Sequence, residues 1–236
     1  MLGIIGGLGP MATAYFMELI TQMTDAATDQ EHIEMIVMSR PQTPDRTAYI
    51  LGKSEETPLD DMADMGRFLT DAGAQFLAIP CITAHYFHDE LESRVGNSVA
   101  HIIRETGQYL RERGVKTVGI MATDGTIGSG LFTKGFKEYG IETVVPDDKH
   151  QAMVMKLIYD DIKAGKPPRL ELFNEVASHL KEQGAAVIIL GCTELSMIKK
   201  DYPLPAGVLD AMEVLASAVV KKCGKLKEEY TELITS

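Results

Sequence analysis

The stretch FLAIPCITAH, residues 76–85, decides the fold class of this chain. Its first five residues are apolar, which is typical of a strand buried in a parallel sheet. The strand leads into Cys81, and Thr83 follows two positions later. In open α/β sheets the ligand site lies at the carboxyl ends of the strands, so this thiol stands where such proteins place their chemistry.

A second stretch, VIILGCTEL at 187–195, has the same design: an apolar strand, then Cys192, then Thr193. Each half of the chain also opens on a Gly-Ile strand with a Gly-rich loop after it, at Gly3 and again at Gly119. The two pairs of matching positions have nearly the same separation along the chain. The sequence therefore predicts an internal repeat of two similar lobes.

Apolar strands alternate with amphipathic segments of helical period, which favours parallel sheets covered by helices. We expect an α/β fold of two similar lobes, each a mainly parallel sheet flanked by helices, related by a pseudo-two-fold axis. The active site would lie in the cleft between the lobes. The expected division assigns residues 1–97 and 207–236 to the first lobe and residues 98–206 to the second.

Composition limits the classes of partner. The chain has 236 residues, 45% of them hydrophobic, and a formal net charge of −11. That charge argues against nucleic acid and against a membrane surface as partners. No apolar run is long enough to span a bilayer, and three cysteines do not make a disulfide framework. We expect a reduced, cytoplasmic protein that acts on a small molecule.

Two thiols that face each other across a cleft suit one type of reaction. One thiolate removes a proton from a carbon acid, and the other thiol returns a proton to the opposite face. A single strand-end cysteine is more often a packing residue, because free cysteine is among the most buried residue types. The matched contexts of Cys81 and Cys192 reverse that preference, whereas Cys223, at a helix end, has no such context.

Several longer motifs make the chain similar to a known family over nearly its whole length. They are GGLGP (6–10), PQTPDRT (41–47), PCITAHYF (80–87), ATDGTIGSGLF (122–132), IYDDIKAGK (158–166) and GCTEL (191–195). With these motifs the sequence resembles the aspartate/glutamate racemases, a family of cofactor-independent enzymes with two catalytic cysteines.

The resemblance implies a racemase that interconverts the L and D forms of aspartate, glutamate or a related amino acid, without cofactor or metal, and that forms a homodimer. It implies Cys81 and Cys192 as the catalytic pair. It also implies a set of substrate-binding residues: Arg46, Thr83, Lys163 and Thr193. Thr123 and Thr126, in the Gly/Thr-rich loop of the second lobe, would add further hydroxyl or backbone donors.

One departure concerns specificity. The family usually has Asn directly after the first cysteine, where its amide helps to bind the amino acid, and this chain has Ile82. Arg40 also adds a cation that the family pattern does not require. Both changes affect the expected substrate range rather than the expected chemistry.

Other interpretations remain open at this point. Gly7-x-Gly9-x-x-Ala12 fits a dinucleotide fingerprint, and Arg40 at the end of the second strand would suit a 2′-phosphate, so an NADP-dependent oxidoreductase is one alternative. A decarboxylase or another isomerase of a small carboxylic acid on the same scaffold is a second, and a two-lobed binding protein a third. Cys81, His85 and His88 match no strong metal-ligand spacing, and His88 is expected on the surface.

Overall fold

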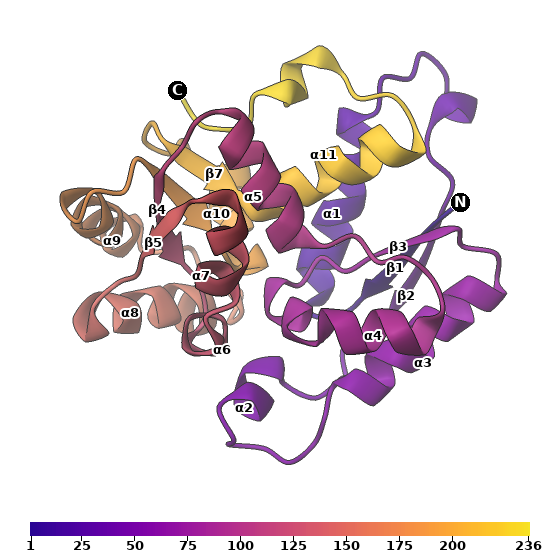
Figure 1. The fold of residues 1–236 in the computed structure, drawn as a ribbon, viewed down its shortest axis with the longest axis horizontal. Coiled ribbons are helices and arrows are strands. Elements are labelled where there is room, and N and C mark those ends of the chain that lie inside the picture. Colours follow the sequence, from indigo (N-terminus) through magenta and orange to yellow (C-terminus); the bar gives the residue numbers. More distant parts are fainter.

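Two separate parallel sheets form the framework of the protein. The computed structural model describes all 236 residues. A three-stranded sheet has the order β2-β1-β3 and a four-stranded sheet the order β5-β4-β6-β7, and every strand pair is parallel. Figure 1 shows the two sheets side by side, each with helices packed around it. The expected α/β fold with two helix-flanked parallel sheets is thereby confirmed.

The strands are short, and all of those expected from the sequence are present. Their bounds are β1 Leu2–Gly6, β2 Met35–Ser39, β3 Phe76–Ala78, β4 Thr117–Met121, β5 Glu142–Val144, β6 Val187–Leu190 and β7 Val208–Asp210. The α-helices are α1 Pro10–Met23, α2 Arg46–Ile50, α3 Leu59–Asp71, α4 His88–Val95, α5 Ile102–Glu112, α6 Asp124–Ser129, α7 Leu131–Phe136, α8 Asp148–Met155, α9 Leu170–Glu182, α10 Thr193–Asp201 and α11 Ala211–Cys223. Short 3-10 helices are η1 Asp29–Glu31, η2 Ile82–Phe87, η3 Lys137–Tyr139 and η5 Glu228–Thr231, and η4 Lys156–Ile162 is a π-helical segment.

Helices α2 and α6 occupy segments whose composition predicts loops. Each begins at a side-chain cap: Asp45 accepts a hydrogen bond from the Ala48 backbone N–H at 2.7 Å, and Thr123 accepts one from the Thr126 N–H at 3.3 Å. Such caps satisfy backbone donors at a helix start, so even a Gly- or Pro-rich segment can form a short helix. Both of these helices lie beside the site described below.

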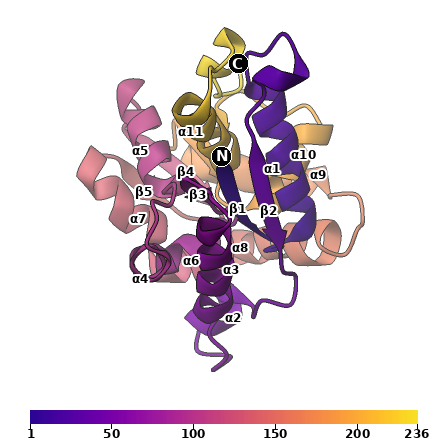
Figure 2. The same ribbon diagram turned by 90° about the vertical axis from the view of Figure 1, so that its right-hand side faces the viewer.

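The last helix joins the two lobes. Helix α11 packs against α1 of the first lobe and α5 of the second, and Figures 1 and 2 show it running between them. The largest hydrophobic cluster accordingly contains both Ile4 of β1 and Ile120 of β4. The lobes therefore share one continuous core on this side. No helix has both the length and the apolar character needed to cross a membrane.

The pairing of β7 changes one detail of the expected lobe division. The division placed residues 207–236 with the first lobe, but Val208–Asp210 pair with β6 in the four-stranded sheet. We propose that β7 belongs to the second lobe and that α11 is shared. The physical reason is that Val208 and Leu209 are buried when the strand pairs with β6. The proline-bearing turn before the strand does not indicate which of the two sheets the strand joins.

The first Gly-rich loop packs tightly against the end of β2. Gly7 has a φ of +88°, and a Cβ atom there would lie 2.4 Å from the Arg40 backbone nitrogen. The Gly7 N–H donates to the hydroxyl of Thr13 at 2.9 Å. Arg40 is paired with Asp61 at 3.1 Å. Close backbone packing thus accounts for this glycine, and the Arg40 cation already has a carboxylate partner, which weakens the dinucleotide interpretation.

Strand β7 ends in a buried carboxyl group that caps α11. Asp210 Oδ1 accepts hydrogen bonds from the Met212 N–H at 2.9 Å and from the Ser196 hydroxyl at 2.8 Å, while Oδ2 is buried without a partner. Burial, reinforced by the Glu213 carboxylate, raises the pKa of Asp210 to about 7. The folded chain therefore holds a proton here at pH values where the unfolded chain has released it.

We predict that the Asp210→Asn variant is more stable than the parent protein at neutral pH. The pKa of this acid is raised on folding, so its stabilising contribution is full below the unfolded pKa of 3.8 and is lost as the pH rises through about 7. The loss amounts to about 1.4 kcal/mol of unfolding free energy per pH unit for one proton. Asparagine caps helices as well as aspartate does but stays neutral. Thermal unfolding at pH 4 and pH 7 tests this: a difference in Tm that is the same at both would contradict it.

Candidate functional site

One small cavity between the lobes brings most of the predicted site residues together. It lies at the carboxyl ends of the strands, and its volume is about 20 Å³. The predicted residues that line it are Arg46, Cys81, Thr83, Thr123, Lys163, Cys192 and Thr193. Thr126 does not line the cavity, but its hydroxyl is within hydrogen-bond distance of Thr83 at 3.0 Å and of Thr123 at 3.2 Å.

The two cysteines occupy equivalent local structures. Cys81 follows β3 and precedes η2, and Cys192 follows β6 and precedes α10. Both have an extended backbone with a φ of −146°, and both are buried with 6% of their surface exposed. Each is a free thiol. The repeat seen in the sequence thus places two thiols, each at the start of a helical segment, against one cavity.

Arg46 presents its guanidinium to the cavity beside Cys81. Its terminal nitrogens donate to backbone carbonyls, at 3.0 Å to Pro44 and at 3.2 Å to Leu8, which fixes the plane of the group. The Nε atom is buried and has no partner. Burial alone would lower the pKa of Arg46, but the Cys81 sulfur and the nearby carboxylates outweigh it, so the pKa is raised. Arg46 is therefore a fixed cation held beside the Cys81 sulfur.

The second cysteine belongs to a chain of three interacting groups. The Cys192 thiol donates to Glu194 Oε2 at 2.8 Å, and Glu194 Oε1 lies 3.8 Å from Lys163 Nζ. Burial, with the Glu194 charge adding to it, raises the pKa of Cys192 well above its ordinary value. For Lys163 burial acts in the opposite direction, but the charges of Glu194 and Cys192 prevail and raise its pKa. Cys192 therefore holds its proton and Lys163 its charge at neutral pH.

Buried hydroxyl groups connect the two lobes across the site. Thr47 and Thr83 of the first lobe lie 3.3 Å and 3.2 Å from the Thr123 hydroxyl of the second. Helices α2 and α6 come so close that a Cβ atom on Gly125 would lie 2.9 Å from the Thr47 Cα. A glycine is thus required for this approach. The contact holds the lobes together directly beside the cavity.

Sequence reasoning missed four polar residues that line the cavity, Asp45, Thr47, Tyr159 and Glu194, and one apolar residue, Leu8. Tyr159 lies under Lys163, whose Nζ is 4.2 Å from the ring centroid. Glu194 could have been found, because it directly follows Cys192-Thr193 and a carboxylate near a thiol affects its proton. Tyr159 gives no such signal, because only the π-helical segment η4 turns it toward the site.

The expectation that His88 lies on the surface is wrong. His88 is buried, its Nε2 donates to the Val99 carbonyl at 2.9 Å, and its ring lies 4.1 Å from that of His101. His85 is also buried and bonds the Ile79 carbonyl at 3.1 Å. Both line a larger cavity of about 720 Å³ that contains neither cysteine. The two histidines therefore serve packing, because η2 directs His85 inward and α4 directs His88 inward, and they do not join Cys81 in a metal site.

Comparison with known proteins agrees with this architecture. Residues 5–219 match the model of the Asp/Glu/hydantoin racemase family. The broad specificity amino-acid racemase RacX of Bacillus subtilis is 26% identical over 233 residues, which is 93% of this chain and 96% of RacX. The aspartate racemase of Picrophilus torridus has a TM-score of 0.82 and 32% identity, over 97% of this chain and 96% of that one.

A third protein is similar in fold alone. It is an aspartate racemase homologue from Pyrococcus horikoshii, with a TM-score of 0.75 and 23% identity over 94% of this chain and 98% of that one. Two parallel sheets with a cavity between them define a two-lobed α/β protein. The chain belongs to the Asp/Glu/hydantoin racemase family. It is an amino-acid racemase, and thus an isomerase.

We predict that the Glu194→Gln variant has a more acidic Cys192. The Glu194 charge is a main contributor, after burial, to the raised pKa of this thiol, and glutamine removes the charge while keeping the shape. The midpoint of Cys192 alkylation by iodoacetamide should therefore move to lower pH. The parent protein and the Glu194→Gln variant both carry Cys81→Ser and Cys223→Ser, so that Cys192 is the single thiol in each. A midpoint that stays or rises would show that Glu194 does not control this proton.

Proposed function

We propose that this protein interconverts the L and D forms of aspartate, glutamate or a related amino acid by two-base proton transfer at Cα. One observation carries the proposal: two equivalent strand-end thiols line one cavity that also contains two cationic side chains, Arg46 and Lys163. A binding protein has no need of two matched thiols. A decarboxylase needs only one protonating group.

The two thiols take opposite roles in each turnover. The thiolate of one cysteine removes the Cα proton, and the electron pair of the C–H bond passes to the carbon. The thiol of the other cysteine then gives its proton to the opposite face of that carbon. The configuration is inverted, the thiol and thiolate have exchanged places, and no cofactor or metal takes part. In the closed state the Cys192 thiol donates to Glu194, which suits Cys192 to the role of acid, and Arg46 lies beside Cys81.

Fixed charges lower the barrier to carbanion formation. The negative charge that develops at Cα spreads onto the α-carboxylate, so a cation held at that carboxylate stabilises the transition state more than the ground state. Arg46 lines the cavity, and carbonyl contacts fix the plane of its guanidinium. Lys163 supplies a second charge for the carboxylate of an acidic side chain. Thr83 and Thr193 add donors beside each cysteine.

The lobes must separate for a substrate to enter. A cavity of about 20 Å³ has room for roughly one water molecule, and an amino acid is several times larger. The lobes would stay joined at α11, where they share a hydrophobic core. They would separate at the cavity, where the Thr47–Thr123 contact would break. Closure around the substrate excludes water and assembles both thiols. A homodimer, expected from the family resemblance, stays a proposal for this chain.

We predict that Cys81 and Cys192 are each essential for racemisation. In D2O, the reduced protein should exchange the Cα proton of its substrate and produce the other enantiomer. The Cys81→Ser and Cys192→Ser variants should each lose about 10²–10⁴-fold in racemisation rate, because a general acid or base contributes that much. NMR follows the exchange and chiral chromatography the enantiomers, over a panel of L- and D-amino acids.

The control is Cys223→Ser, because Cys223 is an exposed thiol outside the cavity. It should leave the rate unchanged. Full racemisation by either single variant would overturn the two-thiol mechanism. Loss of carbon dioxide from the substrate, without inversion, would favour the decarboxylase instead.

We predict that Ile82→Asn shifts preference toward aspartate. Ile82 lines the cavity, is buried, and packs into the largest hydrophobic cluster, so it offers an apolar wall where most of the family has an amide. The ratio of kcat/KM for aspartate to that for an apolar amino acid should rise by about 10-fold, as expected for one polar contact in a pocket. Ile82→Val keeps the wall apolar and should leave the ratio unchanged. An unaltered ratio in Ile82→Asn would show that residue 82 does not set specificity.

A further inference from the structure

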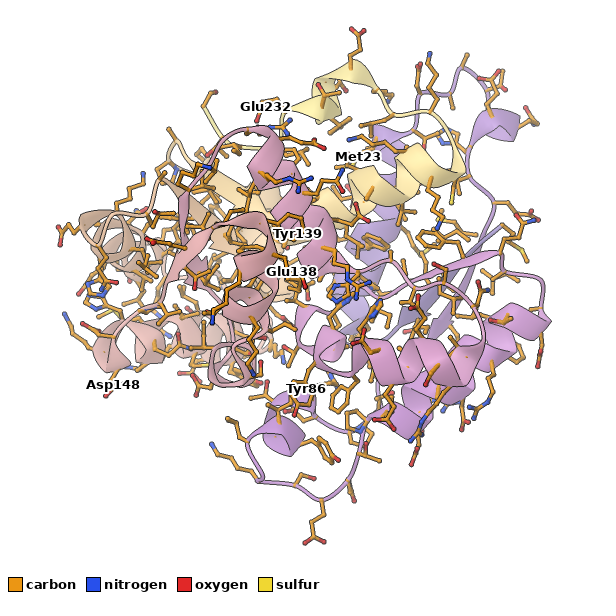
Figure 3. All side chains as sticks on the ribbon, viewed as in Figure 1. Met23, Tyr86, Glu138, Tyr139, Asp148 and Glu232 are labelled. Atoms are coloured by element: carbon orange, nitrogen blue, oxygen red, sulfur yellow. The ribbon has the colours of Figure 1, made fainter.

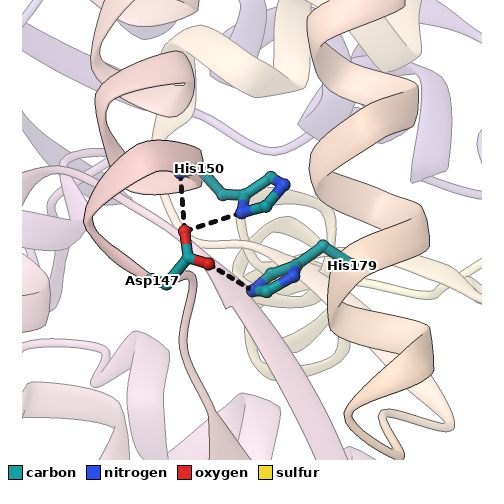
Figure 4. A group of neighbouring side chains, drawn as sticks. All are labelled: Asp147, His150 and His179. Atoms are coloured by element: carbon teal, nitrogen blue, oxygen red, sulfur yellow. Dashed lines mark hydrogen bonds and ion pairs between the residues drawn. The ribbon is translucent and has the colours of Figure 1, made fainter.

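We propose that Asp147, His150 and His179 bind a divalent transition-metal ion such as Zn²⁺ on the outer face of the second lobe. None of the three lines the cavity with the two cysteines. One ligand atom from each residue lies within 4.8 Å of the others. Figure 4 shows both imidazole rings directed at the two oxygens of the same carboxylate. The site is independent of the proposed reaction.

The distances are suited to coordination. Asp147 Oδ1 is 2.7 Å from His150 Nδ1, and Asp147 Oδ2 is 3.7 Å from His179 Nε2. Two ligands of a tetrahedral Zn²⁺ with bonds near 2.0–2.1 Å are about 3.3 Å apart, which falls between these two values. Because the two rings are stacked, each must tilt out of the stack for both lone pairs to converge on one ion. Two imidazoles with one carboxylate favour zinc, cobalt or nickel over magnesium or calcium, which prefer oxygen ligands.

The fold brings the three ligands together before any ion arrives. Asp147 caps α8, accepting the His150 backbone N–H at 2.9 Å. The rings of His150, on α8, and His179, on α9, are stacked with centroids 3.8 Å apart. The side chains of the two histidines are only 12% and 17% exposed, whereas that of Asp147 is 53% exposed. One side of the site is thus open to solvent for further water ligands.

Outer groups support the same interpretation. Glu175 Oε1 lies 3.8 Å from His150 Nε2, the ring nitrogen that faces away from Asp147, and is itself held by Lys149 at 2.7 Å. A carboxylate behind a histidine is the usual second partner of a metal-bound imidazole. Gln183 Nε2 lies 2.7 Å from His179 Nε2. Because the Gln183 amide nitrogen can only donate, His179 Nε2 must accept with its lone pair. A metal ion binds a histidine through the same lone pair. The amide would rotate away when the ion binds.

The position of the cluster makes it accessible. Figure 3 shows Asp148, the next residue after Asp147, pointing outward at the edge of the molecule. An ion here would tie α8 to α9. Gln151, the residue directly after His150, donates to the Ala122 carbonyl at 3.0 Å and to Asp124 at 2.8 Å, beside Thr123. The metal would therefore stabilise the second lobe close to the cavity without entering it.

The test is titration of untagged, metal-free protein with Co²⁺, followed by its visible absorption, and with Zn²⁺, followed by calorimetry. Because thiols also bind these ions, Cys81, Cys192 and Cys223 are first replaced by serine; the wild-type protein is run in parallel in case this background folds poorly. We expect one equivalent of Co²⁺, an intense visible band without sulfur charge transfer, displacement by Zn²⁺ but not by Mg²⁺, and a Tm that rises with Zn²⁺ concentration.

Variants separate the ligands from the helix cap. Asp147→Asn keeps the cap but weakens the ligand, and His150→Gln and His179→Gln each remove a ring. Each should weaken binding at least about 10-fold, and Glu175→Gln should weaken it about 10-fold through the outer contact. His32→Gln, in a histidine outside the cluster, should have no effect. Binding that survives both histidine changes, or no stoichiometric binding at all, would overturn the proposal.

Discussion

Burial of charge beside two thiols is the constraint on which the rest of the structure depends. Glu194 is largely enclosed, the Arg46 Nε is buried, and both cysteines are desolvated around a cavity with room for roughly one water molecule. Charges in such a place are tolerable only when opposite charges and dipoles face them. Arg46 comes from the first lobe, and Glu194 and Lys163 come from the second. Glu194 and Lys163 compensate each other within the second lobe, and the closed arrangement brings Arg46 of the first lobe to the same cavity.

This constraint explains how far the sequence could predict the protein. The strands were predictable because buried parallel strands are continuous apolar runs, and Cys81 and Cys192 because the repeat marks both strand ends. Helices α2 and α6 were not, because their existence depends on the capping side chains of Asp45 and Thr123 in segments of loop composition. The roles that we propose for the cavity residues remain proposals; what the structure adds is that the residues meet.

Contacts between elements distant in sequence lay beyond prediction. His88 is buried because α4 turns its ring onto His101, and periodicity over eight residues is too short to reveal that. Asp147 and His150 meet His179 only because α8 and α9 pack side by side. Helix α8 changes into the π-helical segment η4, and that change directs Tyr159 toward Lys163. Strand β7 pairs with β6 of the second sheet. The local sequence does not show which sheet the strand joins, because the pairing depends on residues distant in the chain.

The closure of the cavity also bears on oxidation. Oxidants attack thiolates that they can reach, and the later products of cysteine oxidation are not reversible. Cys81 and Cys192 are shielded while the lobes are closed, and Cys223 at the end of α11 is the only exposed thiol. Peroxide would therefore modify Cys223 first, and damage to the paired thiols would accumulate only during the time the lobes spend apart. If the lobes open and close as we propose, the lifetime of the protein under oxidative stress would depend on how often they open, and bound substrate would protect Cys81 and Cys192 from oxidation.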